Sequence, residues 1–310
     1  MLKTLILADQ KTISPLIEIL DWITAKGYNC EIKSFEELFF DNRFSVWIGD
    51  KSKEGIPLSK HFYSVWFRRD EAFSAEGNPI VLESTKGNLN YNFKILQKLF
   101  SCFARKHLKV LSSYDSFFLN KLLVLDMAFD LGLDVPQTFL CNNKQKLSMF
   151  ISKYDSVICK SSGENLSIIF NKKNVLKQYV VEIDEKILKD LPDKFFPTLF
   201  QQRIDKQMDI RIFYIDGKFF PMAIFSQCLD FREDYHNHRN VPIKLPADLE
   251  KKLHQLMQKL NLNTGSIDMV RCAKTNKYYF LEVNPNGQFG MVSKPCNYYL
   301  EREIAEFLTT

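Results

Sequence analysis

Apolar residues in the first third of the chain form short runs separated by a helical pattern. Residues 2–8 are typical of a buried strand, a helix is expected from Ser14-Pro15 to Gly27, and residues 30–34 are typical of a second strand. A third strand is expected over 64–69 and a fourth over 109–111. The helix between them is indicated by the spacing of Leu89, Phe93, Leu96, Phe100 and Phe103. This order predicts a parallel sheet within a unit spanning residues 1–112.

The middle of the chain, residues 113–196, predicts a second small unit. A helix is expected from a cap at Ser113 or Asp115 to Gly132. Its apolar stripe would consist of Phe118, Leu122, Leu125 and Phe129. Strands are expected after Thr138 and over 157–160, where the second strand ends in Lys160.

Residues 197–310 predict a third unit with antiparallel strands. A strand is expected over 198–204, and Asp216-Gly217 between the apolar runs 209–215 and 218–224 predicts a hairpin with a type I′ turn. Helices are expected over 249–260 and 298–308. Residues 230–244 are polar and turn-prone, which is typical of a mobile loop over a site.

Three polar residues interrupt two apolar strands near the C-terminus. Asp268 lies in the first of these strands, and Glu282 and Asn284 lie in the second, where both point to one face. An unpaired carboxylate there would cost roughly several kcal/mol, the order expected for a buried charge. A cation is therefore expected between them. Two carboxylates and an amide oxygen suit magnesium better than zinc.

This metal site carries a geometric condition. Asp268 shares a face with Glu282 only if its pairing partner has an even number. Cys272 opposite Tyr278, with the five residues 273–277 as the loop, meets the condition, and so does a three-residue turn with a bulge. The alternative is that Asp268 and Glu282 form ion pairs with nearby Arg or Lys.

The composition excludes several classes of protein. The 310 residues suffice for about two domains, and 45% are hydrophobic, as in globular proteins. No apolar run approaches the ~20 residues of a membrane span. The net charge of +5 comes without a basic block, so nucleic acid is not indicated. Seven cysteines without a Cys-x-x-Cys pair favour a reducing cytoplasm over a disulfide framework or a thiolate zinc site.

Three cations lie at positions suited to an anionic ligand. Lys121 and Lys160 stand at the edge or end of their elements and could hold phosphates, although such lysines are more often solvated. Arg211 lies inside an apolar strand and needs an anionic partner. Asp209, two positions away on the same face, is one candidate for that partner.

Three further arginines are candidates for contact with substrate. Arg68 and Arg69 end a strand and alternate faces, so one of them can point to a cleft and meet a carboxylate. A salt bridge or solvent exposure is the alternative. Arg239 in the polar segment could meet a phosphate when that segment closes.

The order of these segments resembles the ATP-grasp superfamily over residues 112–310. The matching segments are Asn120-Lys121, Gly132 to Thr138, Cys159-Lys160, Phe200-Gln-Gln-Arg-Ile204, Asp209-Ile-Arg211, Asp268 and Glu282-Val-Asn284-Pro-Asn-Gly-Gln. Trp66-Phe67-Arg68-Arg69, together with the Asn284-Pro-x-Gly-Gln-Phe ending, looks like the ATP-grasp peptide maturases that make microviridin-type graspetides, including the grasp-with-spasm branch.

The resemblance implies a fold and a set of site residues. It implies an α/β pre-ATP-grasp domain and two α+β lobes that clasp ATP, with magnesium as the metal. Phosphates would be held by Lys121 and Lys160, and adenine would meet backbone groups of Gln201, Gln202, Arg203 and Ile204. Magnesium ions would be bound by Asp268, Glu282 and Asn284. The catalytic group would be Arg211, which would stabilise the transferring phosphoryl group, with Asp209 and Arg239. The loop after Lys160 departs from the family because it is poor in glycine.

The resemblance also implies a reaction. An Asp or Glu side chain of a ribosomal precursor peptide would become an acyl phosphate, and a Thr, Ser or Lys side chain would displace phosphate to close an ω-ester or ω-amide ring. A homodimer fits the same resemblance. The alternatives are an ATP-grasp ligase that adds amino acids, such as glutamate, to a protein C-terminus, and a non-catalytic nucleotide- or peptide-binding module.

Overall fold

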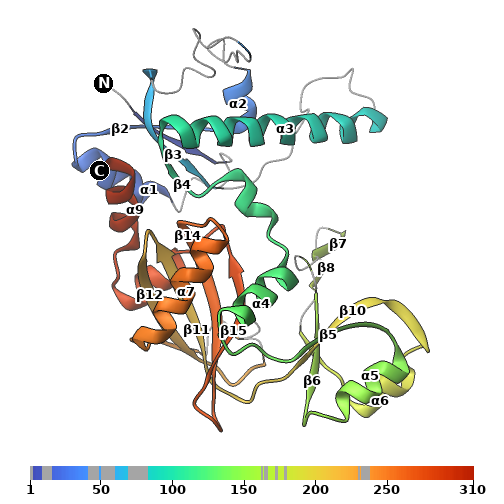
Figure 1. Cartoon of the computed structure of the whole chain (residues 1–310). Helices are drawn as coiled ribbons and strands as arrows, with labels where there is room; N and C mark the ends of the chain where they lie inside the picture. The colour runs from blue at the N-terminus through green and yellow to red at the C-terminus, as the bar shows by residue number, and fades with distance from the viewer. Residues whose placement is uncertain are drawn as a thin grey trace.

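The chain folds into three units of helices and strands, each built around its own sheet. In Figure 1 the N-terminal unit lies at the top and the two lobes lie below it. The structure is a computed structural model that describes residues 3–8, 16–40, 49, 60–68, 83–161, 163, 167–171, 174–177, 180–229, 231 and 238–310. Within these residues no helix is both long and apolar enough to cross a bilayer.

The N-terminal unit contains the predicted parallel sheet, in the order β2-β1-β3-β4. Its strands are β1 (Lys3–Leu7), β2 (Asn29–Lys33), β3 (Phe62–Phe67) and β4 (Lys109–Leu111), and its helices are α1 (Ile17–Ala25), α2 (Phe35–Phe39) and α3 (Glu83–His107). Ser34 begins α2 in a capping box with Glu37. Phenylalanines from α2 and α3, including Phe35, Phe93 and Phe100, pack on one face of the sheet.

The middle lobe has a four-stranded sheet in the order β5-β10-β6-β9. The strands are β5 (Thr138–Asn143), β6 (Val157–Lys160), β9 (Val181–Glu182) and β10 (Lys194–Gln202), with α5 (Lys144–Ile151) and α6 (Glu185–Asp190) beside them. β7 (Ser167–Asn171) and β8 (Asn174–Lys177) form a separate antiparallel pair. The core of the middle lobe is small, with Leu147, Val157 and Phe200 at its centre.

The C-terminal lobe is a five-stranded antiparallel sheet in the order β13-β12-β11-β14-β15. The strands are β11 (Lys206–Ile215), β12 (Lys218–Phe225), β13 (Arg239–Pro242), β14 (Thr264–Cys272) and β15 (Tyr278–Asn284). Asp216 and Gly217, both with positive φ, make the predicted hairpin turn. The expectation of a loop through residue 244 is wrong for 239–242, because β13 pairs with β12.

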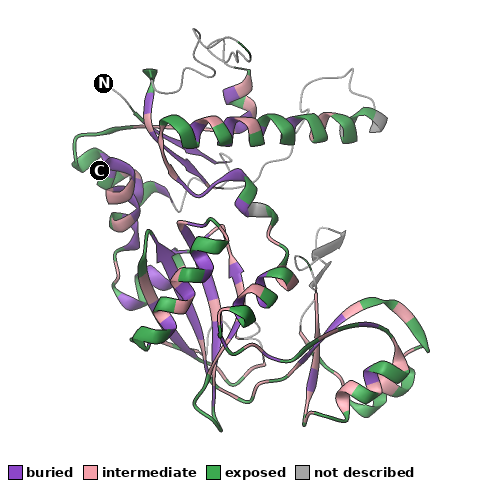
Figure 2. Cartoon of the chain, viewed as in Figure 1, coloured by how far each residue is buried: buried purple, intermediate pink, exposed green. Residues whose placement is uncertain are grey.

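Helices cover this sheet on both faces. On one face, α4 (Lys121–Asp130) and α7 (Ala247–Lys259) pack on alternate strand residues such as Ile210, Ile212 and Ile267. On the other, Phe213 and Ile215 pack with α8 (Gly290–Cys296) and α9 (Leu300–Thr309). Figure 2 shows the central strands as largely buried. The residue alternation of the strands therefore separates two cores.

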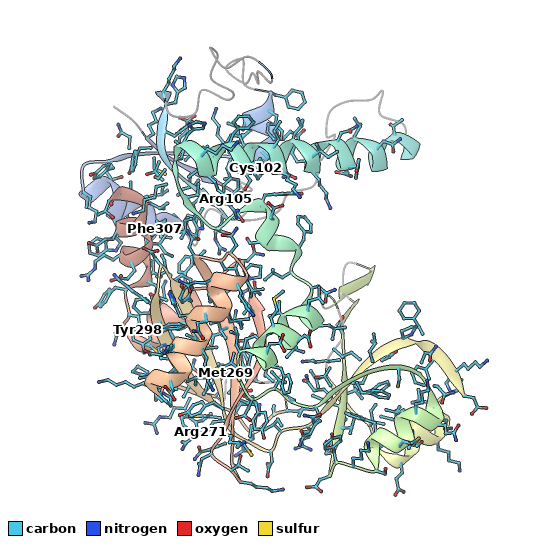
Figure 3. The ribbon with its side chains drawn as sticks, viewed as in Figure 1. Cys102, Arg105, Met269, Arg271, Tyr298 and Phe307 are labelled. Carbon is cyan, nitrogen blue, oxygen red and sulfur yellow. The ribbon has the colours of Figure 1, made fainter. Side chains whose placement is uncertain are left out.

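The last helix, α9, joins the C-terminal lobe to the N-terminal sheet. The Ser64 hydroxyl donates to the Leu308 carbonyl over 2.8 Å, and the Lys109 ammonium lies 4.4 Å from the ring centre of Phe307, labelled in Figure 3. At the other end, Tyr298 Oη donates to the Pro221 carbonyl in β12 over 2.7 Å. The chain's end thus fixes the N-terminal sheet to the C-terminal lobe.

The start of α4 differs from the prediction. Residues 114–118 form a separate 3₁₀ helix, η4 (Tyr114–Phe118), and the cap is Asn120, whose side chain accepts from the amides of Leu122 and Leu123. The predicted stripe is also wrong, because its first and last members, Phe118 and Phe129, are exposed. The buried face is formed by Val124, Leu125 and Ala128. The side that faces inward is set by packing on the C-terminal sheet, where Val124, Leu125 and Ala128 belong to the core.

Candidate active site

A row of charged side chains crosses the C-terminal sheet. Arg211 in β11 lies opposite Asp268 in β14, which lies opposite Glu282 in β15. Residues directly opposite in a sheet share a face, so the three side chains point to the same side. Arg211 Nη1 donates to Asp268 Oδ1 over 2.7 Å, and the Arg211 side chain is only 6% exposed. The anionic partner of Arg211 is therefore Asp268; Asp209 pairs with another cation.

A bulge meets the geometric condition for the hairpin. The pairing shifts between Asp268 and Met269, so that Asp268 lies opposite Glu282 while Arg271 lies opposite Tyr278. The predicted pairing of Cys272 with Tyr278 is wrong. Figure 3 shows Met269 and Arg271 on this hairpin, Arg271 nearer its turn. The extra residue on β15 turns Glu282 to the face of Asp268.

Lys121 reaches the row from the first turn of α4. Its ammonium lies 2.8 Å from Glu282 Oε2, and the side chains are 33% and 25% exposed. Asn120 sets this position by capping the helix one residue earlier. Both carboxylates thus have a cationic partner, as the ion-pair alternative in the sequence anticipated.

The donor atoms fit a magnesium ion. Asn284 is two residues beyond Glu282 on the same strand face, and its Oδ1 accepts from the amide of Asn286 over 3.1 Å. Two carboxylates and an amide oxygen are the hard ligands that magnesium prefers. Among the described residues no three His, Cys, Asp or Glu side chains converge. A protein site here therefore depends on Asn284 as its third ligand.

A pocket opens between this row and the sheet of the middle lobe. It is lined by most of the predicted residues: Lys121, Lys160, Gln201, Gln202, Arg203, Ile204, Asp209, Asp268 and Glu282. Apolar side chains, among them Ile158, Met269 and Leu281, complete its wall. A pocket that is lined by both apolar side chains and cations suits a ligand with a flat base and a charged tail.

Several groups of the strand predicted to meet adenine already form hydrogen bonds within the protein. The amides of Gln202 and Arg203 donate to the carbonyls of Gln137 and Ser156, and the Gln201 side chain donates to the Thr138 hydroxyl. The Arg203 guanidinium pairs with Glu182 over 2.7 Å. The Ser156 hydroxyl and Arg203 hold the pKa of that carboxyl below its ordinary value. These contacts fix the strand that crosses between the lobes.

Lys206 is a pocket residue that the sequence reasoning missed. Its ammonium contacts Asp209 Oδ2 at 2.5 Å and the Leu229 carbonyl at 2.9 Å. Both charged side chains are nearly buried, at 14% and 13% exposure. The strand pairing shifts between Lys206 and Met208, which breaks the alternation that would otherwise place Lys206 on the face opposite Asp209.

Arg68 links the N-terminal sheet to the turn after β15. It donates to the Asn286 carbonyl over 2.8 Å, and its guanidinium carbon lies 5.5 Å from the ring centres of both Trp66 and Phe289. The two segments that carried the maturase resemblance are therefore in contact. Arg69 lies outside the described residues, and Arg239 is exposed in β13 and does not line the pocket.

Cys159 is the thiol closest in sequence to the pocket lysine Lys160. Burial raises the pKa of this thiol. Because the thiolate is the nucleophilic form, Cys159 is poorly suited to covalent chemistry.

Two lobes with a ligand pocket between their sheets, and a charged row on its floor, define the ATP-grasp class. Residues 119–308 match the profile of the RimK-like ATP-grasp domain, and the chain belongs to this family. No curated protein sequence matches it significantly.

Solved structures of the same fold cover nearly the whole chain. The macrocyclase MdnC from Microcystis aeruginosa MRC, bound with precursor peptide MdnA, matches with a TM-score of 0.80 and 22% identity over 99% of both chains. A RiPP-associated ATP-grasp ligase from Chryseobacterium gregarium, in complex with ADP and a leader and core peptide, matches with a TM-score of 0.80 and 19% identity, over 100% of this chain and 96% of that one. The ATP-grasp ligase PsnB, complexed with minimal precursor, Mg and ADP, matches with a TM-score of 0.73 and 14% identity, over 98% and 96%. At these identities the likeness shows a common fold.

Proposed function

We propose that this protein is an ATP-dependent ligase that closes rings in a ribosomal precursor peptide. The carrying observation is the row of Lys121, Glu282, Asp268 and Arg211, whose first three members line a pocket between the lobes. The choice of a peptide substrate is supported by full-length likeness to ligases solved with precursor peptides.

The proposed chemistry needs the carboxylate to be activated first. An oxygen of an Asp or Glu side chain bonds to the γ-phosphorus of ATP, and the bond from that phosphorus to ADP breaks. A Thr or Ser hydroxyl, or a Lys amine, then bonds to the acyl carbon, loses its proton, and phosphate leaves. Each ring therefore consumes one ATP and removes the elements of one water from the peptide.

The cations of the pocket offset the charge that develops on the phosphoryl group. Lys121 and Lys160 line the pocket, and Arg211 lies next to the lining residue Asp268, with which it pairs. Fixed cations in a site shielded from water stabilise such charge more than they do in solution. Asp268, Glu282 and Asn284 would hold magnesium, which supplies a Lewis acid for the phosphate oxygens. Arg211, aligned by Asp268, needs no reorganisation at the moment of transfer.

The test is incubation with ATP, magnesium and a small Thr- and Asp/Glu-rich peptide encoded beside the protein. The expected product is lighter than the substrate by one water for each ring, and ADP forms in equal number. Glu282→Gln is the matched control because it keeps the size of the side chain and removes its charge. Addition of an amino acid to the peptide, or full dehydration by Glu282→Gln, would overturn the proposal.

A further inference from the structure

The two carboxylates proposed as metal ligands are both held by cations proposed for the phosphates. Lys121 Nζ lies 2.8 Å from Glu282, and Arg211 Nη1 lies 2.7 Å from Asp268 Oδ1. Along the row from Lys121 through Glu282 and Asp268 to Arg211 the charges run positive, negative, negative, positive. Glu282 and Asp268 are directly opposite each other on neighbouring strands, an arrangement in which like charges repel.

A divalent ion between these carboxylates would relieve the repulsion, and so do the two flanking cations. A metal that takes the same oxygens must therefore compete with an ammonium or a guanidinium. The two cations differ in how easily they can leave. Arg211 lies inside β11 and is 6% exposed, whereas Lys121 stands on the first turn of a helix and is 33% exposed. Lys121 has a flexible stem and is the partner that can move.

We infer that Lys121 is a place-holder for the metal. The Lys121 ammonium stays paired with the Glu282 carboxylate until a nucleotide phosphate binds the ammonium instead, which leaves Glu282 open to the metal. Metal and nucleotide therefore bind cooperatively. This rests on the proposed function, since it assigns Glu282 to the metal and Lys121 to a phosphate. Linkage requires the effect to be reciprocal: nucleotide strengthens metal binding by the same factor as metal strengthens nucleotide binding.

The first test measures the affinity of the protein for Mn²⁺ without nucleotide, from the electron paramagnetic resonance signal of the free ion. Mn²⁺ is used because it prefers oxygen ligands, as magnesium does. Lys121→Met keeps the length of the side chain and removes the competing charge. It is expected to bind Mn²⁺ roughly tenfold more tightly than the wild type, the order for a partly shielded ion pair.

Lys206→Met is the matched control. It also removes an ammonium from the pocket, but Lys206 pairs with Asp209, which is not a proposed ligand. It is expected to raise Mn²⁺ affinity by less than about threefold, through general electrostatics alone. An unchanged affinity in Lys121→Met, or equal gains in both variants, would overturn the inference.

The second test approaches the same pair from the carboxylate. Glu282→Gln releases Lys121, so the affinity for ADP in the presence of a chelator is expected to rise about fivefold to tenfold in calorimetry. Added Mn²⁺ is expected to strengthen ADP binding less than in the wild type. Unchanged metal-free ADP binding in this variant would show that Glu282 does not hold Lys121 and would overturn the inference.

These outcomes are separate from the proposed function. Binding of Mn²⁺ and ADP is measured without a peptide, on the full chain, and thermal unfolding checks that each variant is folded. If the variants show the expected changes in Mn²⁺ and ADP affinity but the wild type dehydrates no peptide, the inference on Lys121 is supported and the ring-closing activity is overturned. A wild type that closes rings, with no gain in Lys121→Met, does the opposite.

Discussion

The face of the C-terminal sheet that carries Arg211 is apolar at one end and charged at the other. Along β11, Phe213 and Ile215 are buried in an apolar core, and the Phe213 ring lies 6.2 Å from that of Phe289. Asp209 and Arg211, on the same face of the same strand, carry charge and form ion pairs. Strand alternation assigns all four residues to one face. What differs is the cover, since helices and the N-terminal sheet close one end and a pocket opens over the other.

The largest effect is expected at the charged end. Asp268→Asn removes the carboxylate that aligns Arg211 and one proposed metal ligand. ATP-dependent dehydration of the peptide is expected to fall about 10³-fold, the order for loss of one preorganised charged group. Asp134→Asn is the control, because Asp134 pairs with Lys277 at the surface. A residual rate within about tenfold of wild type in Asp268→Asn contradicts the active-site assignment.

The apolar end is expected to govern stability. Phe289 is 2% exposed and packs between Trp66 and Phe213. Phe289→Ala is expected to lower the free energy of unfolding by roughly 3 kcal/mol or more, as for other buried rings. Phe196→Ala, at an 86% exposed position, is expected to change it by less than about 0.5 kcal/mol. Equal losses of unfolding free energy in the two variants, measured by denaturant titration, would contradict this prediction.

Arg68 lies where the two ends meet, and its substitution sharpens the comparison. Arg68→Met keeps apolar contact with the rings but loses the charged hydrogen bond to Asn286. The free energy of unfolding is expected to fall by about 2 kcal/mol, the order for such a bond. A rise in the KM for the peptide at unchanged stability would instead assign Arg68 to the substrate carboxylate. Both quantities are measured on the same variant.

The smallest effect is expected at Glu182, outside both ends. The Ser156 hydroxyl and Arg203 lower the pKa of this carboxyl, so its ionised form stabilises the folded state above the ordinary pKa of 4.5. This contribution disappears as pH falls through the lowered folded-state pKa. Because the Glu182 side chain is 44% exposed, it amounts to less than about 1 kcal/mol. Wild type and Glu182→Gln should differ in unfolding free energy near neutral pH and converge in acid; a constant difference contradicts the assignment.

Local patterns predicted most elements because their causes are local. Apolar runs identified β11 and β12, and Asp216-Gly217 fixed their turn through its backbone conformation. The same rule placed Glu282 and Asn284 on one face. The start of α4 was predicted wrongly because several polar residues could cap it. The start of α4 depends on Asn120, and the exposed Phe118 belongs to a separate 3₁₀ helix.

Bulges mark the limit of pattern reasoning at the site. One residue too many on a strand reverses every later side chain, and nothing in the residue types near Gln207 or Leu281 fixes where that happens. The sequence could state that Asp268 and Glu282 need an odd loop or a bulge. The structure supplied the bulge, and another shift brought Lys206 to Asp209.

The sequence by itself determined which residues are charged within apolar strands and which of them share a face within one regular stretch of strand, because both follow from residue type and the two-residue repeat of a strand. Only the tertiary structure decided their partners. Lys121 meets Glu282, Arg211 meets Asp268, and Arg68 meets the turn before Phe289. Each contact joins residues at least 57 positions apart in the chain. Such pairs are fixed by how separate elements pack, which no local pattern encodes.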